Sequence, residues 1–274
     1  MVSLVLVTMA AAATMGVAQV PIPASPPGFT YASGSAEAHI QLDMFIDLLC
    51  PDSKAAYPAL QQVVANLSST DFRLRFHQFP LPYHHNAYSF AQASRTITHA
   101  LGEDKFTRWM ETVYAHQDAF WNKQTETLGQ KQVTDQIGQL AKKTFPELTD
   151  AQWAEGMTGH GGTQMDVDTR TEWKYACTRG ISGTPMYLLN EVPFDADASW
   201  TYDDWMKALK PLLTGDKMIA TDANVRSGLE QTHQTVVDPH HGYEFLAYMG
   251  VGTVLGVGIL LIAQRYDAGY QTLR

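Results

Sequence analysis

The 274-residue sequence predicts an α/β fold, and three features of its pattern lead to this prediction. Two strand-like segments, residues 39–48 and 72–79, flank a segment with helical spacing. A long helical block, about residues 86–178, follows them. Two short strands and an amphipathic helix come last. The order β-α-β, helices, β-β-α implies a parallel strand pair joined by a right-handed crossover, with an all-helical insertion before the final strands.

The opening β-α-β unit is the best-defined part of the pattern. The segment "HIQLDMFIDL", residues 39–48, is rich in branched and aromatic residues and predicts a buried strand. Pro51 stands where the first turn of a helix tolerates proline. Apolar residues then recur at helical spacing over residues 54–67. The segment "FRLRFHQF", residues 72–79, alternates apolar and polar residues, which predicts a half-buried strand.

Five helices are expected in the insertion. Thr149 is a suitable N-cap for the fourth, and Gly180 is suited to the C′ position after the fifth. Cys177 belongs to the fifth helix, and we expect it to be a packed small residue of an apolar face rather than a redox partner. The chain then predicts a hairpin of residues 186–189 and 192–194 across Asn190–Glu191, and a helix at residues 202–213.

Both ends of the chain indicate membrane targeting. Residues 1–18 are apolar and rich in small residues, and predict a signal peptide, with an uncleaved anchor as the alternative. Residues 19–37 predict an extended linker, and residues 214–242 a polar stalk. Residues 243–263 are long enough for one transmembrane helix, followed by a short cytoplasmic tail, 264–274. This organisation predicts a single-pass type I membrane protein whose body lies in the secretory-pathway lumen or outside the cell.

Further features bear on partners and modification. The formal net charge of −9, without a clustered basic face, argues against nucleic-acid binding. Gly252 and Gly256 form a G-x-x-x-G pair in the predicted span, a spacing that permits a homodimer. Asn66 begins an N-x-S sequon, so it is a candidate glycosylation site in a lumenal body. No metal-binding spacing of His and Cys is present, and we expect no metal.

Three sequence blocks resemble a known family. They are "FIDLLCPDSKAAYP" around Cys50, "FPLPYHHNAYSFAQA" at residues 79–93, and "RGISGTPMYLLN" at residues 179–190. In this order they resemble the active-site turn, the insertion junction and the cis-proline loop of DsbA-like thioredoxin-fold proteins, over about residues 38–213. The resemblance implies a thioredoxin-like fold with a DsbA-like helical insertion. It also implies a nucleophilic Cys50 and a loop, Thr184–Pro185, that holds the substrate backbone.

The chain departs from this family at one position. Dithiol members carry C-x-x-C, whereas here the sequence is Cys50-Pro51-Asp52-Ser53, a C-x-x-S variant. The second cysteine of the chain, Cys177, is not expected within the roughly 7 Å Cα separation that a disulfide requires. The two-thiol cycle therefore does not carry over, and the predicted site has one catalytic thiol.

The chemistry expected at Cys50 follows from its position at a helix start. The positive end of the helix dipole stabilises a thiolate there, and Ser53 is expected to donate a hydrogen bond to it. Asp52 acts in the opposite direction, because a second negative charge nearby is unfavourable. Pro51 fixes the turn. A mixed disulfide with a client must then be resolved by glutathione, another protein thiol or a second client thiol.

The leading hypothesis is monothiol thiol-disulfide exchange, isomerase-like or reductase-like, on client proteins with thiols or disulfides. Cys50 and Ser53 are its catalytic residues, and Pro51, Thr184, Pro185 and His84 are its substrate-binding residues. No cofactor is expected, apart from glutathione as a resolving thiol. His84 or its neighbour could assist proton transfer to the leaving thiol, or could simply cap the loop-helix junction. The alternatives are a redox-silent, membrane-anchored binding or chaperone-like module, and a kappa-type glutathione transferase.

Overall fold

A computed structural model describes residues 22–158 and 163–214, which all belong to the first of two units of the chain, Met1–Ile219. The predicted signal peptide, the stalk beyond residue 214, the transmembrane helix with its glycine pair, and the tail lie outside the described residues. They remain predictions. Within the described ranges, no helix has the length and apolarity to cross a bilayer.

The described elements follow the predicted order. The first half comprises β1 (Phe29–Thr30), β2 (Ile40–Ile46), α1 (Pro51–Asn66) and β3 (Phe72–Gln78). The insertion comprises α2 (Ala87–Leu101), α3 (Lys105–His116), the 3-10 helix η1 (Gln117–Phe120), α4 (Asn122–Thr125), α5 (Gln130–Thr144), α6 (Asp150–Met157) and α7 (Gln164–Thr178). The chain then forms β4 (Met186–Leu189), β5 (Val192–Phe194) and α8 (Tyr202–Leu213).

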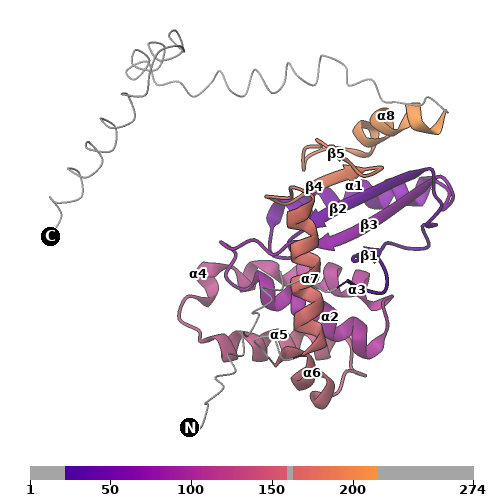
Figure 1. The fold of residues 1–274 in the computed structure, drawn as a ribbon. Helices are drawn as coiled ribbons and strands as arrows, with labels where there is room; N and C mark the ends of the chain where they lie inside the picture. Colours follow the sequence, from indigo (N-terminus) through magenta and orange to yellow (C-terminus); the bar gives the residue numbers. More distant parts are fainter. Residues whose placement is uncertain (1–21, 159–162, 215–274) are drawn as a thin grey trace, which may run out of the picture. The chain divides into compact units, whose positions relative to one another are not determined.

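The strands form one mixed sheet with the order β1-β3-β2-β4-β5 (Figure 1). The central pair, β2 and β3, is parallel, as the opening β-α-β unit predicts, and the other neighbours are antiparallel. Met44 of β2 lies opposite Phe76 of β3 on one side and Tyr187 of β4 on the other. The hairpin between β4 and β5 turns at Asn190 and Glu191, which both have positive φ. The predicted hairpin and its turn are confirmed.

The two faces of the sheet are covered by different helices. Residues 40, 42, 44 and 46 of β2 point to the larger core, which α1 and α8 complete with Leu60, Val63, Trp205 and Leu209. The opposite face carries Phe45, which packs beside Ala176 of α7. Figure 1 shows α7 crossing this second face.

Glu172 fixes the helical insertion to the sheet. Its side chain is buried, and its two oxygens accept hydrogen bonds from the backbone N–H of Gln78 in β3 and from Arg95 in α2. A buried carboxylate of this kind is stable only with such partners. The contact therefore sets the position of α7 and α2 against the end of β3, from which the insertion starts.

The segment before β2 differs from the predicted linker. Phe29 and Thr30 pair antiparallel with β3, and the Phe29 ring stacks on Phe106 with 3.8 Å between ring centroids. The domain therefore begins earlier than residue 38. The sequence did not predict this edge strand because β1 is only two residues long and follows a Pro-rich segment.

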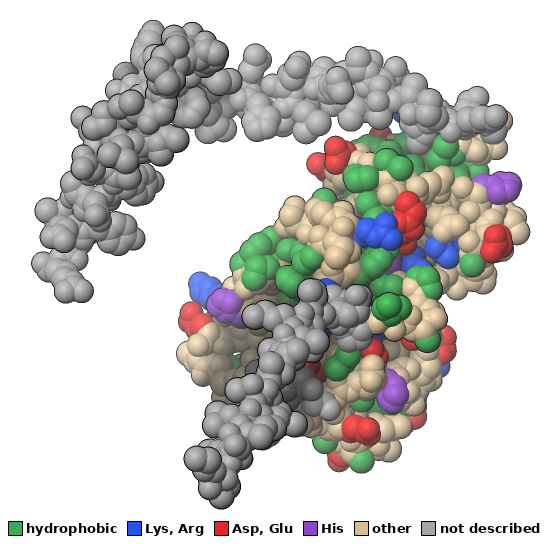
Figure 2. Space-filling model, viewed as in Figure 1, with side chains coloured by type: hydrophobic (Ala, Val, Ile, Leu, Met, Phe, Trp, Pro, Cys, Tyr) green, Lys and Arg blue, Asp and Glu red, His purple; other side chains and the backbone are tan. Residues whose placement is uncertain are grey.

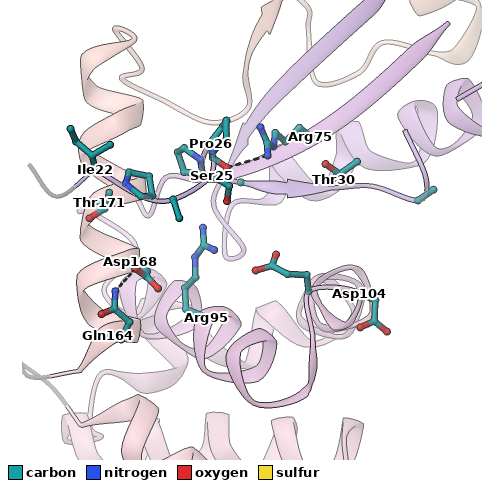
Figure 3. A pocket seen from close by; sticks show the side chains of 16 residues that line it. Ile22, Ser25, Pro26, Thr30, Arg75, Arg95, Asp104, Gln164, Asp168 and Thr171 are labelled. Carbon is teal, nitrogen blue, oxygen red and sulfur yellow. Dashed lines mark hydrogen bonds between the residues drawn. The ribbon is translucent and has the colours of Figure 1, made fainter. Parts of the chain in front are cut away.

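A cavity of about 790 Å³ lies under the segment that precedes β1 (Figure 3). Arg75 donates to the carbonyl of Pro26 at its edge, and Arg95 points into it from α2. Asp104 and Asp168 also line it, so charges of both signs face the space. The same mixture is seen on the face drawn in Figure 2, where basic side chains stand among acidic ones.

Candidate active site

Cys50 is the N-cap residue of α1 and lies where β2 leaves the sheet. Its backbone is extended, with φ −76° and ψ 122°, and Pro51 follows as the first helical residue. The turn is closed by a hydrogen bond from the backbone N–H of Cys50 to the carbonyl of Asp47, with N···O 3.0 Å. The Cys50 side chain makes no capping hydrogen bond to the first turn of α1, and it lies at the positive end of the helix. The predicted place of Pro51 in the first turn is confirmed, and α1 begins three residues before the helical spacing that starts at residue 54.

The loop before β4 contacts Cys50, although Thr184 in this loop lies 134 positions later in the sequence. The Cys50 thiol donates a hydrogen bond to the carbonyl of Thr184, with Sγ···O 3.3 Å. The Thr184–Pro185 peptide bond is cis, as the resemblance implied. The Thr184 hydroxyl is buried and has no hydrogen-bond partner among the described residues. The Cys50 thiol and the unpaired Thr184 hydroxyl thus belong to two residues in direct contact.

Sequence reasoning missed Asp47, which organises the site. Its carboxylate is buried, with 2% of the residue exposed. Oδ1 accepts from the backbone N–H of Leu49 at 2.8 Å, and Oδ2 accepts from the backbone N–H of Leu81 at 3.0 Å and from His84 Nδ1 at 2.7 Å. Asp47 therefore joins the turn that carries Cys50 to the loop between β3 and α2. The available signal was an acidic residue inside an apolar run, three positions before the cysteine.

The insertion closes the site from a third side. Trp121 Nε1 donates to the carbonyl of Leu49 at 3.2 Å, and Gln117 Nε2 donates to the carbonyl of Leu48 at 3.0 Å. Tyr114 lies buried behind them. Burial raises the pKa of the Tyr114 hydroxyl well above its usual value, and the charges of Asp47 and Cys50 act in the same direction. This phenol therefore stays neutral at physiological pH.

Ser53 does not take the predicted position. It is fully buried on the inner face of α1, and its Oγ accepts from the backbone N–H of Asp47, with N···O 3.4 Å. No hydrogen bond joins Ser53 to the Cys50 thiol in the described structure. The difference arises because Ser53, one turn into α1, faces the end of β2, whereas the thiol faces Thr184.

A sequence profile described as thioredoxin matches residues 28–211. The chain belongs to the thioredoxin family. No curated protein sequence matches the chain.

Solved structures resemble it in fold at low identity. Alpha-DsbA1 from Wolbachia pipientis superposes with a TM-score of 0.53 at 13% identity, covering 72% of this chain and 94% of that chain. A thioredoxin-like oxidoreductase from Silicibacter pomeroyi DSS-3 gives a TM-score of 0.50 at 16% identity, covering 70% and 95%. The thiol-disulfide exchange protein alpha-DsbA2 from Wolbachia pipientis gives a TM-score of 0.50 at 12% identity, covering 68% of this chain and 87% of that chain. At these identities the likeness supports the predicted thioredoxin-like fold with DsbA-like neighbours.

Cys177 corrects one expectation. Within this thioredoxin-family domain it is exposed on α7 and free, and its neighbour Ala176 occupies the buried position instead. Adjacent helical residues are rotated by about 100°, so only one of the two can face the sheet. Partial desolvation raises the pKa of the Cys177 thiol.

Two further predicted site residues lie at the surface. Asn66 ends α1, where its Nδ2 donates to the carbonyl of Gln62 at 2.8 Å. His84 lies at the rim of the site. Among the described residues, no group of three His, Cys, Asp or Glu side chains could hold a metal ion.

We predict that Asp47→Asn destabilises the protein by about 2 kcal/mol, because an amide cannot accept all the hydrogen bonds that now reach the buried carboxylate. Urea unfolding followed by circular dichroism measures the change. Asp52→Asn is the matched control, since Asp52 is exposed in the first turn of α1, and it should cost less than about 1 kcal/mol. Equal effects of the two substitutions would contradict the organising role of Asp47.

Proposed function

We propose that this chain carries out thiol-disulfide exchange on protein clients with Cys50 as its single catalytic thiol. The observation that carries the proposal is the contact between the Cys50 thiol and the Thr184 carbonyl, with Sγ···O 3.3 Å. It joins the cysteine at a helix N-terminus to the loop that, by resemblance, holds substrate backbone. Membership of the thioredoxin family supports this function.

The contact with Thr184 suits a reaction that begins with ionisation of the thiol. A thiol donates to a carbonyl, but a thiolate has no proton to donate. Loss of the proton therefore frees the Thr184 carbonyl to accept a hydrogen bond from a client N–H. The thiolate then attacks a client disulfide and forms a mixed disulfide, while the second client sulfur leaves.

The hydroxyl of Ser53 determines how the mixed disulfide is released. A hydroxyl cannot attack this disulfide as a second thiol would, so an external thiol must release Cys50. Glutathione, another protein thiol or a second thiol of the client could do this. The site thus suits isomerisation or reduction, in which the client ends with its own thiols or with a different disulfide.

Exposed aromatic side chains beside the site support a protein as the substrate. Tyr83 is 59% exposed and Trp121 is 39% exposed, and the backbone of Tyr83 is tied to the Trp121 segment by Asn122 Nδ2, with N···O 2.7 Å. Aromatic side chains of this kind bury large areas on contact at a low cost in conformational entropy. They offer a client segment an apolar contact next to the thiol.

We further propose that this reaction takes place in a lumen or outside the cell. The sequence patterns of a signal peptide at residues 1–18 and a single span at 243–263 support this location, as does the exposure of the candidate glycosylation site Asn66. Oxidising compartments are where disulfide clients occur. A homodimer through Gly252 and Gly256 remains a further proposal about the span.

Two other functions predict different behaviour. A redox-silent binding module would bind clients equally well after Cys50→Ser. A kappa-type glutathione transferase would conjugate glutathione to an electrophile in the absence of any disulfide. The low exposure of Cys50, 4% of the residue, is the observation that favours a silent module, and the reactivity of this thiol decides between them.

We predict that Cys50 forms a mixed disulfide with a disulfide-bonded peptide at pH 7 at least about tenfold faster than Cys177 does, because Cys50 is the N-cap of α1, beside the loop that holds substrate backbone, whereas Cys177 lies in the last turn of α7. The raised pKa of Cys177 adds to the difference. Mass spectrometry of proteolytic fragments identifies the modified residue. Cys177→Ser should retain the reaction. If the peptide is found mainly on Cys177, the site is redox-silent.

Ser53→Cys should shorten the lifetime of the mixed disulfide on Cys50, measured without added thiol, by at least about tenfold, because an intramolecular thiol has a high effective concentration. Ser53→Ala, which adds no thiol, is the matched control and should leave the adduct long-lived. A wild-type adduct that decays as fast as the Ser53→Cys adduct would show that another group of the protein resolves it.

A further inference from the structure

His84 lies between a buried carboxylate and the solvent. Its Nδ1 is 2.7 Å from Asp47 Oδ2, and because a carboxylate only accepts, Nδ1 carries a proton. The other ring nitrogen, Nε2, has no hydrogen-bond partner among the described residues. The His84 side chain is 21% exposed, whereas the Asp47 side chain has no exposed surface. Asp47 therefore fixes the orientation of the ring and leaves Nε2 as the atom that exchanges protons with water.

This ring is held at the rim of the nucleophile's turn by independent contacts. The same Asp47 carboxylate accepts from the backbone N–H of Leu49, the residue before Cys50. The Asn122 side chain bridges both residues that flank His84, accepting from the backbone N–H of His85 at 3.0 Å and donating to the carbonyl before His84 at 2.7 Å. Asp47 thus links His84 to the turn that carries Cys50, and Asn122 holds the backbone on both sides of His84.

We propose that His84 is the general acid of the exchange reaction, positioned by Asp47, and that it protonates the client sulfur that leaves. The proposal rests on the proposed function of Cys50. When the Cys50 thiolate attacks one sulfur of the client disulfide, a new S–S bond forms and the old one breaks. The electron pair of the broken bond goes to the second client sulfur, which takes the Nε2 proton of the His84 imidazolium. The neutral ring then regains a proton from water.

The surroundings of His84 suit this role. Asp47 is the charged side chain hydrogen-bonded to it in the described structure, and this contact fixes the orientation of the ring beside the turn that carries Cys50. Protonation matters most when the leaving thiolate is basic, as an aliphatic thiolate is. A positioned acid typically contributes about 10²–10⁴-fold to such a step. A thiol that leaves readily as an anion gains little from it.

The test compares two disulfides on the full-length protein. One is 5,5′-dithiobis(2-nitrobenzoate), whose aromatic thiolate leaves readily; the other is an aliphatic peptide disulfide. His84→Gln should slow the reaction of Cys50 with the peptide disulfide about 100-fold and change the reaction with the aromatic disulfide little. The aromatic reaction thus also reports that the turn and its thiol are intact. His85→Gln is the matched control, because His85 is the exposed neighbour, and it should alter neither rate.

A second variant separates chemistry from structure. His84→Ala should show the same selective loss, and imidazole added to the solution should restore part of the peptide rate. An equal loss with both disulfides, or no loss with either, would overturn the role of His84 as an acid while leaving the reactivity of Cys50 established. If wild-type Cys50 reacted with neither disulfide, both this inference and the proposed function would be overturned.

Discussion

The buried carboxylate of Asp47 is the constraint on which the site depends. It accepts three hydrogen bonds from two chain segments that the sheet alone would not hold together, the turn before α1 and the loop before α2. Each hydrogen bond to a charged group contributes about 1.5–3 kcal/mol, and the carboxylate could not stay buried without them. Cys50 and His84 therefore keep a fixed relation, set by one side chain of the apolar run.

A hydroxyl, that of Ser53, stands at the position where dithiol members of the resembling family carry a second thiol. Ser53 occupies a fully buried position and accepts from the backbone of Asp47, so it contributes to the same turn. The thiol itself faces the loop before β4 through Thr184. Under the proposed mechanism, a site with this arrangement would capture a client on Cys50 and would need an outside thiol to release it. The surrounding thiols would then control turnover.

Much of the fold was predictable because it rests on local patterns. The parallel pair β2 and β3, the hairpin at Asn190 and Glu191, and the helical insertion all follow from periodicity and turn residues. The meeting of Cys50 with Thr184 was implied by the family resemblance. Three features could not be read in this way: the short edge strand β1, the orientation of Ser53 and the exposure of Cys177. β1 is too short to show a pattern, and the other two features depend on which face of a helix meets the sheet, which a one-residue rotation reverses.

The hydrogen-bond partners of Asp47 also could not be predicted from the sequence. An acidic residue within an apolar run indicates a buried hydrogen-bond partner, but the sequence does not say which residue donates to it. Its partners, Leu81 and His84, lie in a separate loop more than thirty positions away. The fold brings the turn before α1 and the loop before α2 close to each other, and the hydrogen bonds to Asp47 then hold them together. The residue that organises the site was therefore visible in the sequence, whereas its role was not.

If Cys50 acts as a lone thiol, the mixed disulfide that it forms with a client peptide provides the most direct test. The adduct would be isolated, and its decay measured against increasing glutathione. We predict a release rate proportional to the glutathione concentration, with an intercept close to zero. Failure of Cys50 to form the adduct, or a release rate independent of added thiol, would contradict the lone-thiol mechanism.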